Sequence, residues 1–356
     1  MKKTFLTAMA AVMLTACSED EMMTLRQDAI TFDNAFVDNA TRSYDGSYKT
    51  NNLTEFQVWG TIINANNQMA NIFNGEKVSK TAFTGDAGTG DTWKYDATNT
   101  QYWIPGNSYK FWAIAEGNVI KENGDSITSV YAPEIGKNEP THINLYDASK
   151  QKDILLATAE KSNYQTGDGN NTQVNFTFEH LLAKAKFTVK NAITTDNGYS
   201  YKVSNIQITN ADKNAFYKIS SNTNKKWTFD SDTNNRNTYS LGFGNAVDAD
   251  CSIQNVGAVD IAYNSSKVSN YERLLIPNTK QLDISFKCQL FKDGILIDTQ
   301  DERTITTTQA VTLEAGKAYN FIISLGNPGD PITFNVTEVK SWDESHNGYT
   351  PGVDMK

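Results

Sequence analysis

The sequence from Val174 to Val189 reads VNFTFEHLLAKAKFTV. Its first half alternates apolar and polar residues, and its second half places Lys184 and Lys186 between small or apolar residues, with Lys190 following in the same phase. A period of two is that of a β-strand, whereas an α-helix repeats every 3.6 residues. We therefore expect two strands whose apolar side chains face a core and whose lysines face solvent.

The same period of two recurs along the chain, and no segment sustains a helical period. Near the C-terminal end, two alternating runs flank Lys292-Asp293-Gly294, and Asp-Gly is a strong signal for a β-hairpin. The polar stretches 121–141 and 230–250 are expected to be surface loops. The sequence therefore predicts an all-β fold. Further strand-like runs lie at 53–63, 93–104, 109–115, 203–208, 274–276 and 311–325.

The chain is too long for a single ordinary core, so two domains are expected from its 356 residues. Residues 160–173 are polar and rich in Gly, Asn and Thr, which is typical of a linker. We expect two sandwich-like domains in series, over residues 43–165 and 166–330. A further strand and tail would occupy residues 331–356.

The N-terminus has the pattern of a signal peptide over residues 1–16. Lys2 and Lys3 precede a short apolar run that is too short to span a membrane. The residues before Cys17, Leu-Thr-Ala, resemble the lipobox of bacterial lipoproteins, which implies cleavage before Cys17 and lipidation of that cysteine. The alternative is an ordinary secretory signal with a chance cysteine. The acidic residues 18–21 resemble an export tag and favour the outer face of the outer membrane.

Two cysteines remain after Cys17. Cys288 alternates in phase with Ile284 and Phe286, so we expect it to face a core. A disulfide to Cys251 is chemically allowed in an oxidising compartment, but two cysteines do not make a disulfide framework. We expect two buried thiols.

Nothing in the sequence indicates catalysis, a cofactor or a metal site. His142, His180 and His346 lie far apart, and no zinc spacing, nucleophile elbow or phosphate-binding loop occurs. The net charge of −9, without a basic run, argues against a nucleic-acid partner. A glycosidase-like carboxylate pair stays open because acidic residues are plentiful. Three aromatic residues are compatible with a sugar-stacking platform, although core packing is favoured. They are Trp93, Tyr102 and Trp103.

Two isolated alternating segments flank the expected domains. Within residues 17–42, one parity carries Ile30, Phe32 and Phe36, which marks a candidate strand ahead of the first domain. After Pro328 and Pro331, the chain alternates without interruption, and we expect the two prolines to form a stiff hinge that projects this last strand outward. The alternative is a final strand in its own domain's sheet. The inward positions of this strand are Ile332, Phe334 and Val336.

Several segments together resemble the fimbrillin-like lipoproteins, which include the pilins of type V pili. They are residues 153–158 (DILLAT), 174–189, 274–277 (LLIP), and Thr41-Arg42 followed by Leu53, Phe56 and Val58. The resemblance implies two transthyretin-like β-sandwich domains, surface export, cleavage by an arginine-specific protease and assembly by strand exchange with other pilin subunits. Carried onto this chain, it implies a cut after Arg42, with Arg26 as a less favoured site. It also implies donation of the strand Ile332–Val336 to a neighbouring subunit.

The sequence thus predicts a structural or adhesive pilus subunit that is not an enzyme. Its expected partners are other pilin subunits, an arginine-specific protease, the outer membrane through a lipid anchor, and host or bacterial surface ligands. One alternative is a monomeric surface lipoprotein that binds glycans. Another is a β-sandwich glycoside hydrolase.

Replacing Cys17 by alanine tests the lipid anchor. The thiol is the attachment point that the lipobox resemblance implies, so the Cys17→Ala chain should incorporate no labelled fatty acid when expressed in a host that processes lipoproteins. A Cys288→Ala chain is the matched control and should label like the parent. Persistent labelling of Cys17→Ala would contradict the assignment.

Overall fold

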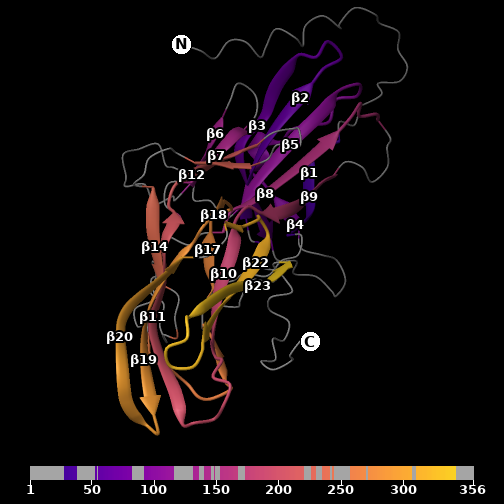
Figure 1. Ribbon diagram of the computed structural model, residues 1–356. Coiled ribbons are helices and arrows are strands. Elements are labelled where there is room, and N and C mark those ends of the chain that lie inside the picture. The colour runs from indigo at the N-terminus through magenta and orange to yellow at the C-terminus, as the bar shows by residue number, and fades with distance from the viewer. Residues whose placement is uncertain are drawn as a thin grey trace, which may run out of the picture.

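The computed structural model describes residues 28–37, 53, 55–81, 92–115, 131–135, 140–145, 148, 153–166, 173–219, 226–229, 235–240, 243, 257–269, 272–306 and 310–341. In this part the chain is built from β-strands (Figure 1) apart from a short 3-10 helix, η2 (Ala97–Asn99), so the predicted all-β class is confirmed. Buried apolar side chains gather in two clusters. One fills a barrel near the N-terminal end of the described chain, and the other lies between the sheets that follow.

Seven strands form the closed barrel. Its core is dominated by aromatic rings, among them Phe56, Phe73, Phe111 and Phe176. Gly60 lies in the barrel strand that is second along the chain, and it makes room for these rings. A Cβ at this position would lie 2.8 Å from the ring of Phe73 and 3.1 Å from the ring of Phe111. Around the barrel the order is β1 (Thr31–Val37), β4 (Thr92–Lys94), β3 (Met69–Thr81), β2 (Glu55–Ile63), β5 (Ser108–Ala115), β8 (Leu155–Lys161) and β9 (Gln173–His180).

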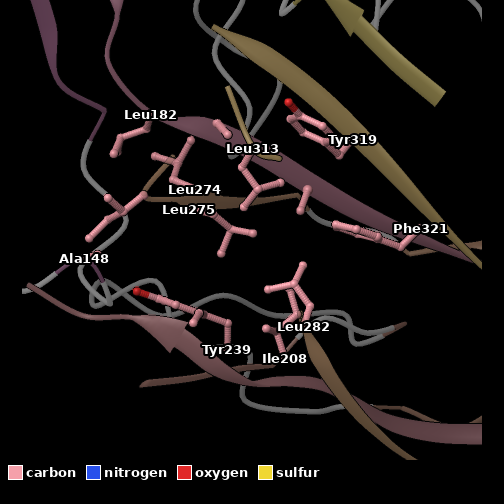
Figure 2. Packing of buried hydrophobic residues seen from close by; sticks show 14 of the residues in the cluster. Ala148, Leu182, Ile208, Tyr239, Leu274, Leu275, Leu282, Leu313, Tyr319 and Phe321 are labelled. Carbon is pink, nitrogen blue, oxygen red and sulfur yellow. The ribbon is translucent and has the colours of Figure 1, made fainter. Parts of the chain in front are cut away.

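The second cluster lies between two sheets (Figure 2). Tyr319 and Phe321 come from one sheet, and Ile208 and Tyr239 come from the other. The first sheet has the order β16 (Ser266–Val268), β10 (Ala183–Asn191), β22 (Lys317–Leu325) and β23 (Thr333–Ser341), with β17 (Arg273–Leu275) also on β10. The second has the order β14 (Arg236–Ser240), β11 (Tyr199–Asp212), β19 (Asp283–Lys292) and β20 (Ile295–Thr306), with β15 (Val259–Ile261) also on β11.

A third sheet joins segments from both halves of the sequence. Its order is β13 (Lys226–Thr228), β12 (Ala215–Lys218), β7 (Pro140–Leu145) and β6 (Tyr131–Ile135), and a small pair is formed by β18 (Thr279–Lys280) and β21 (Val311–Thr312). Ile143 and Leu145 of β7 belong to the second cluster. The expectation of a loop over 121–141 is therefore wrong for β6 and the start of β7, and β14 likewise interrupts the expected loop 230–250. Short strands among polar residues give too little alternation to be recognised.

The boundary expected at residue 166 does not match the sheets. Strand β9 lies beyond that boundary, yet it pairs with β8 and β1, and Val174, Phe176 and Phe178 belong to the barrel core. The chain leaves the barrel only after His180, through Leu181 and Leu182. Alternation shows that a strand has an apolar face, but it does not show which core that face completes.

Two local predictions are confirmed. Asp293 and Gly294 join β19 to β20, both with positive φ (48° and 78°), which is the conformation that favours glycine in a tight hairpin. Cys288 is buried, and its sulfur is not part of a disulfide. Cys251 lies outside the described residues.

Lys184 departs from the expected pattern. Its side chain is fully buried, and Nζ lies 3.3 Å from Oε2 of Glu272, whose side chain is 13% exposed. Strand β10 lies inside its sheet, between β22 and β17, and Glu272, which directly precedes β17, supplies the counter-charge beside the buried ammonium group. Loss of solvent lowers the pKa of Lys184, and the charge of Glu272 opposes that shift. Nearby in sequence, His180 and Asp153 form a second buried contact, with 2.7 Å between Nδ1 and Oδ2.

Removing one partner of the Lys184–Glu272 pair should cost more than removing both. Lys184→Met leaves the Glu272 carboxylate without its cation, and breaking such a buried pair typically costs about 3–5 kcal/mol of unfolding free energy. The double variant Lys184→Met/Glu272→Met should recover most of this loss. Denaturant unfolding measures both, with the exposed Lys190→Met as control. A single variant as stable as the parent would contradict the pair.

Candidate functional site: the strand that closes the barrel

Strand β1 closes the barrel. On one side it pairs with β4 in antiparallel orientation, with Phe32 opposite Trp93, and on the other it pairs with β9 in parallel orientation. The parallel register begins with Thr31 opposite Gln173 and ends with Val37 opposite Phe178. Without β1, the edges of β4 and β9 would have no partner in this barrel.

The side chains before and within β1 complete the aromatic core. Ile30 is 0% exposed and Phe32 is 3% exposed. The ring of Phe32 stacks on Phe176, with centroids 5.8 Å apart and planes 17° from parallel. Four more rings surround it at centroid distances between 5.4 and 6.3 Å. They are Phe56, Phe73, Tyr95 and Phe111.

Hydrogen bonds hold the residues just before β1. The amide of Ile30 donates to the carbonyl of Gln101 (2.8 Å), and the amide of Trp103 donates to the carbonyl of Asp28 (2.9 Å). The hydroxyl of Tyr95 donates to the carbonyl of Ile30 (2.8 Å). Burial raises the pKa of Tyr95 above its ordinary value, so this hydroxyl keeps its proton and remains a donor.

The side chain of Asp28 also has a hydrogen-bond partner in the barrel. Its Oδ2 accepts a hydrogen bond from the hydroxyl of Tyr164 (3.0 Å). The Tyr164 ring is buried and stacks on Trp103, with 5.1 Å between centroids, and Nζ of Lys161 lies 5.0 Å from the Tyr164 centroid. Neither residue stands in a recognisable motif, and the two are 136 residues apart, so no sequence signal points to this contact.

The structure describes the side chains of two of the three residues predicted to face inward in the N-terminal strand. Ile30 and Phe32 occupy the core as expected. Phe36 lies opposite Thr177 after an irregularity in which two residues of β1 face one of β9, and its side chain is not among those described. That irregularity breaks the simple alternation expected from the sequence. Arg26, Arg42 and Cys17 lie outside the described residues.

The last strand does not project outward. After the turn at Asn327–Asp330, β23 folds back and pairs with β22 in antiparallel orientation (Figure 1), so the expected proline hinge is wrong for this state. Phe334 is half-buried and stacks on Phe321, with 5.6 Å between centroids, and Ile332 is half-buried as well. Val336 lies opposite Phe321 in the register, and its side chain is outside those described. The turn reverses the chain, so the prolines lead into the hairpin.

The other candidate sites have structural roles in the described part. Trp93 and Trp103 belong to the barrel core, which leaves Tyr102, 46% exposed, as the accessible one of the three aromatic residues considered for sugar stacking. His180 is buried against Asp153. No group of three or more described His, Cys, Asp and Glu residues could hold a metal ion. Among the residues that the structure describes, no helix has the length and apolar character needed to cross a membrane.

A model of the fimbrillin-like family matches residues 41–342. The chain belongs to the fimbrillin-like family. The resemblance seen in the sequence is thus confirmed, and the members of this family are structural proteins and not enzymes, as predicted. None of the curated protein sequences matches the chain significantly.

One of the solved structures that match this chain shares its fold with a TM-score above 0.5. A fimbrial protein from Bacteroides vulgatus superposes with a TM-score of 0.59 at 16% identity, over 88% of this chain and 99% of that one. Two proteins described as putative cell adhesion proteins also match. That from Bacteroides uniformis has a TM-score of 0.44 at 15% identity, over 88% and 99% of the two chains. That from Bacteroides ovatus has a TM-score of 0.46 at 13% identity, over 89% and 98%.

Truncating Phe32 tests how much β1 contributes to this fimbrillin-like chain. Phe32→Ala removes a ring that five others surround, and such core truncations cost about 3–5 kcal/mol. Thr31→Ala, at the exposed neighbouring position, should change the unfolding free energy by less than about 0.5 kcal/mol. Denaturant unfolding of the uncleaved chain measures both. Equal stabilities of the two variants would show that β1 is not an integral part of the barrel.

Proposed function

We propose that this protein is a pilus subunit, exported to the cell surface as a lipoprotein and assembled by strand exchange after proteolysis. The observation that carries the proposal is that β1 completes the barrel core although it precedes the predicted cut site at Arg42. The family match begins at residue 41, so β1 lies before the region of the chain that matches the family.

Chain connectivity makes β1 separable. Its last residue, Val37, is followed by residues 38–54 before β2 begins at Glu55. A cut after Arg42 falls in this connection and would leave β1 attached to the barrel by non-covalent contacts alone. A cut after Arg26 would leave β1 joined to the rest of the chain, which favours Arg42.

Departure of β1 would create a strong acceptor for another strand. The edges of β4 and β9 would lose their partner, and the aromatic pocket around Phe32 would open to water. Unpaired strand edges beside an apolar groove are templates for strand addition. Full burial of one large apolar side chain contributes about 1.5–3 kcal/mol, and a new backbone ladder adds to this.

The C-terminal strand of a neighbouring subunit is the proposed donor. Ile332 and Phe334 are only half-buried against their own domain, so detaching β23 gives up less burial than a fully enclosed groove provides. The donor residues are Ile332, Phe334 and Val336. The partners that follow are other pilin subunits, an arginine-specific surface protease, the outer membrane through lipidated Cys17, and surface ligands of a host or another bacterium.

Limited proteolysis tests the proposal. A precursor that starts at residue 18, and so carries no lipid, is treated with an arginine-specific protease and followed by N-terminal sequencing and gel filtration. The new N-terminus should be Ser43, and the monomer should convert to detergent-resistant multimers. Arg42→Ala should stay monomeric, whereas Arg26→Ala should assemble like the parent.

A donor variant separates cleavage from assembly. Phe334→Asp should be cut normally but should not assemble, while Thr333→Asp at the exposed neighbouring position should assemble. Because Phe334 also stacks on Phe321, the melting temperature of each uncleaved variant is measured as a folding control. A parent chain that is cut after Arg42 and remains monomeric would favour the monomeric surface-binding alternative.

A further inference from the structure

The strand proposed to leave and the strand proposed to enter share a sequence. Residues 28–37 read DAITFDNAFV, and residues 330–339 read DPITFNVTEV. Five of the ten positions are identical: Asp, Ile, Thr, Phe and the final Val. The two segments lie at opposite ends of the described chain, in different sheets.

The shared residues have the same inside and outside pattern. Ile30 and Phe32 face the barrel core while Thr31 is exposed, and Ile332 and Phe334 pack against their own domain while Thr333 is exposed. In both places the phenylalanine lies nearly parallel to another ring, at 17° to Phe176 for Phe32 and at 15° to Phe321 for Phe334. The second strand therefore already has the side-chain pattern that the barrel accepts.

The two strands also share a backbone irregularity. In β1, Asn34 and Ala35 face one residue of β9, and in β23 one extra residue, Thr337, stands between the pairs formed by Val336 and Glu338. A shift of 302 residues aligns the shared sequence and places Thr337 on Ala35. Val339 then falls on Val37, which is opposite the buried Phe178 in the register of β9.

In this alignment Pro331 of the C-terminal segment corresponds to Ala29, and the backbone at Ala29 can accept a proline. The bridge between Ala29 and Tyr102 is made by the amide of Ile30 and the carbonyl of Asp28, so the amide of Ala29 takes no part in it. Proline lacks an amide hydrogen and is accepted where the ladder does not need one. Pro331 can therefore stand where Ala29 stands, and the residue before a proline is held extended, as a strand requires.

The shared aspartate also has a hydrogen-bond partner in the barrel. In the uncleaved chain, the Tyr164 hydroxyl donates to Oδ2 of Asp28. Asp330 has a different partner before exchange, since its Oδ2 accepts from the amide and the side-chain nitrogen of Asn327 (2.8 and 3.0 Å). Opening the turn at Asn327–Asp330 frees this carboxylate for Tyr164 of the next subunit.

We propose that the C-terminal strand of a second copy of this chain enters the barrel in one defined register, parallel to β9, with Asp330, Ile332 and Phe334 in the places of Asp28, Ile30 and Phe32. This inference rests on the proposed strand exchange and adds the register and orientation. The uncleaved N-terminal strand is then an internal copy of the donor that occupies its site until proteolysis.

Cysteine cross-linking reads the register directly. Thr31 pairs with Gln173 in β1 and β9, so Thr333 of the donor should lie opposite Gln173 of the acceptor, and both side chains point outward. A Thr333→Cys chain is mixed with a differently tagged Gln173→Cys chain, cleaved with the arginine-specific protease, oxidised mildly, and analysed by non-reducing electrophoresis and peptide mass spectrometry. A disulfide between the two tagged chains is expected.

Two acceptor variants on the same outward face are the matched controls. Asn175→Cys and Thr177→Cys lie two and four residues further along β9, and a shift of two residues moves a partner about 6.6 Å along the strand, beyond the reach of a disulfide. The yield of cross-link with these two variants should fall to the background yield. That background is measured with an acceptor chain without an added cysteine, in which Thr333→Cys can bond only to Cys251 or Cys288.

The outcomes separate this inference from the function beneath it. Multimers with the Gln173 cross-link support the register. Multimers that cross-link instead at position 175 or 177, or at none of the three positions, overturn it while leaving subunit assembly in place. A cleaved chain that forms no multimers overturns the strand exchange and the register together.

Discussion

The parallel pairing of β1 with β9 over an aromatic core is the contact on which the barrel depends. It closes the ring of seven strands and covers the rings packed around Phe32. Because this single short strand satisfies two sheet edges and part of the core together, its presence or absence separates a closed module from one with an open groove. The hydrogen bonds from Tyr95 and Tyr164 hold the residues just before β1 and so fix the position at which the strand begins.

The second cluster repeats this arrangement with one difference. Strand β10 pairs in parallel with β22 over eight residue pairs, much as β1 pairs with β9. However, β10 continues directly from β9 through Leu181 and Leu182, whereas residues 38–54 separate β1 from β2. The parallel pair of the second cluster is therefore directly continuous with β9, whereas a longer connection separates β1 from the next strand of the barrel. The buried pairs Asp153–His180 and Lys184–Glu272 lie near the crossing between them.

Local patterns predicted much of this molecule. The alternation in β9, the Asp293-Gly294 hairpin, the burial of Cys288 and the strand at Ile30 and Phe32 follow from short-range periodicity, which the chain obeys. The failures concern contacts between distant segments. Lys184 is buried beside Glu272, which is distant from it in the sequence, and the inward side chains of β9 complete the core of a barrel whose other strands precede it along the chain. The tyrosines that hold Asp28 and Ile30 could not be found, because their partners are brought close only by the fold.

The parallel orientation has a mechanical consequence for a filament built from such subunits. A donor strand lying parallel to β9 is connected to its own subunit at its N-terminal end, while β9 is connected to β10 at its C-terminal end. Tension along the filament would pull these neighbours from opposite ends and load their hydrogen bonds in shear, all together. The pair β10 and β22 would be loaded in the same way, because β22 leads into β23, the proposed donor. Single-molecule pulling on joined subunits would contradict this geometry if they peeled apart one bond at a time at low force.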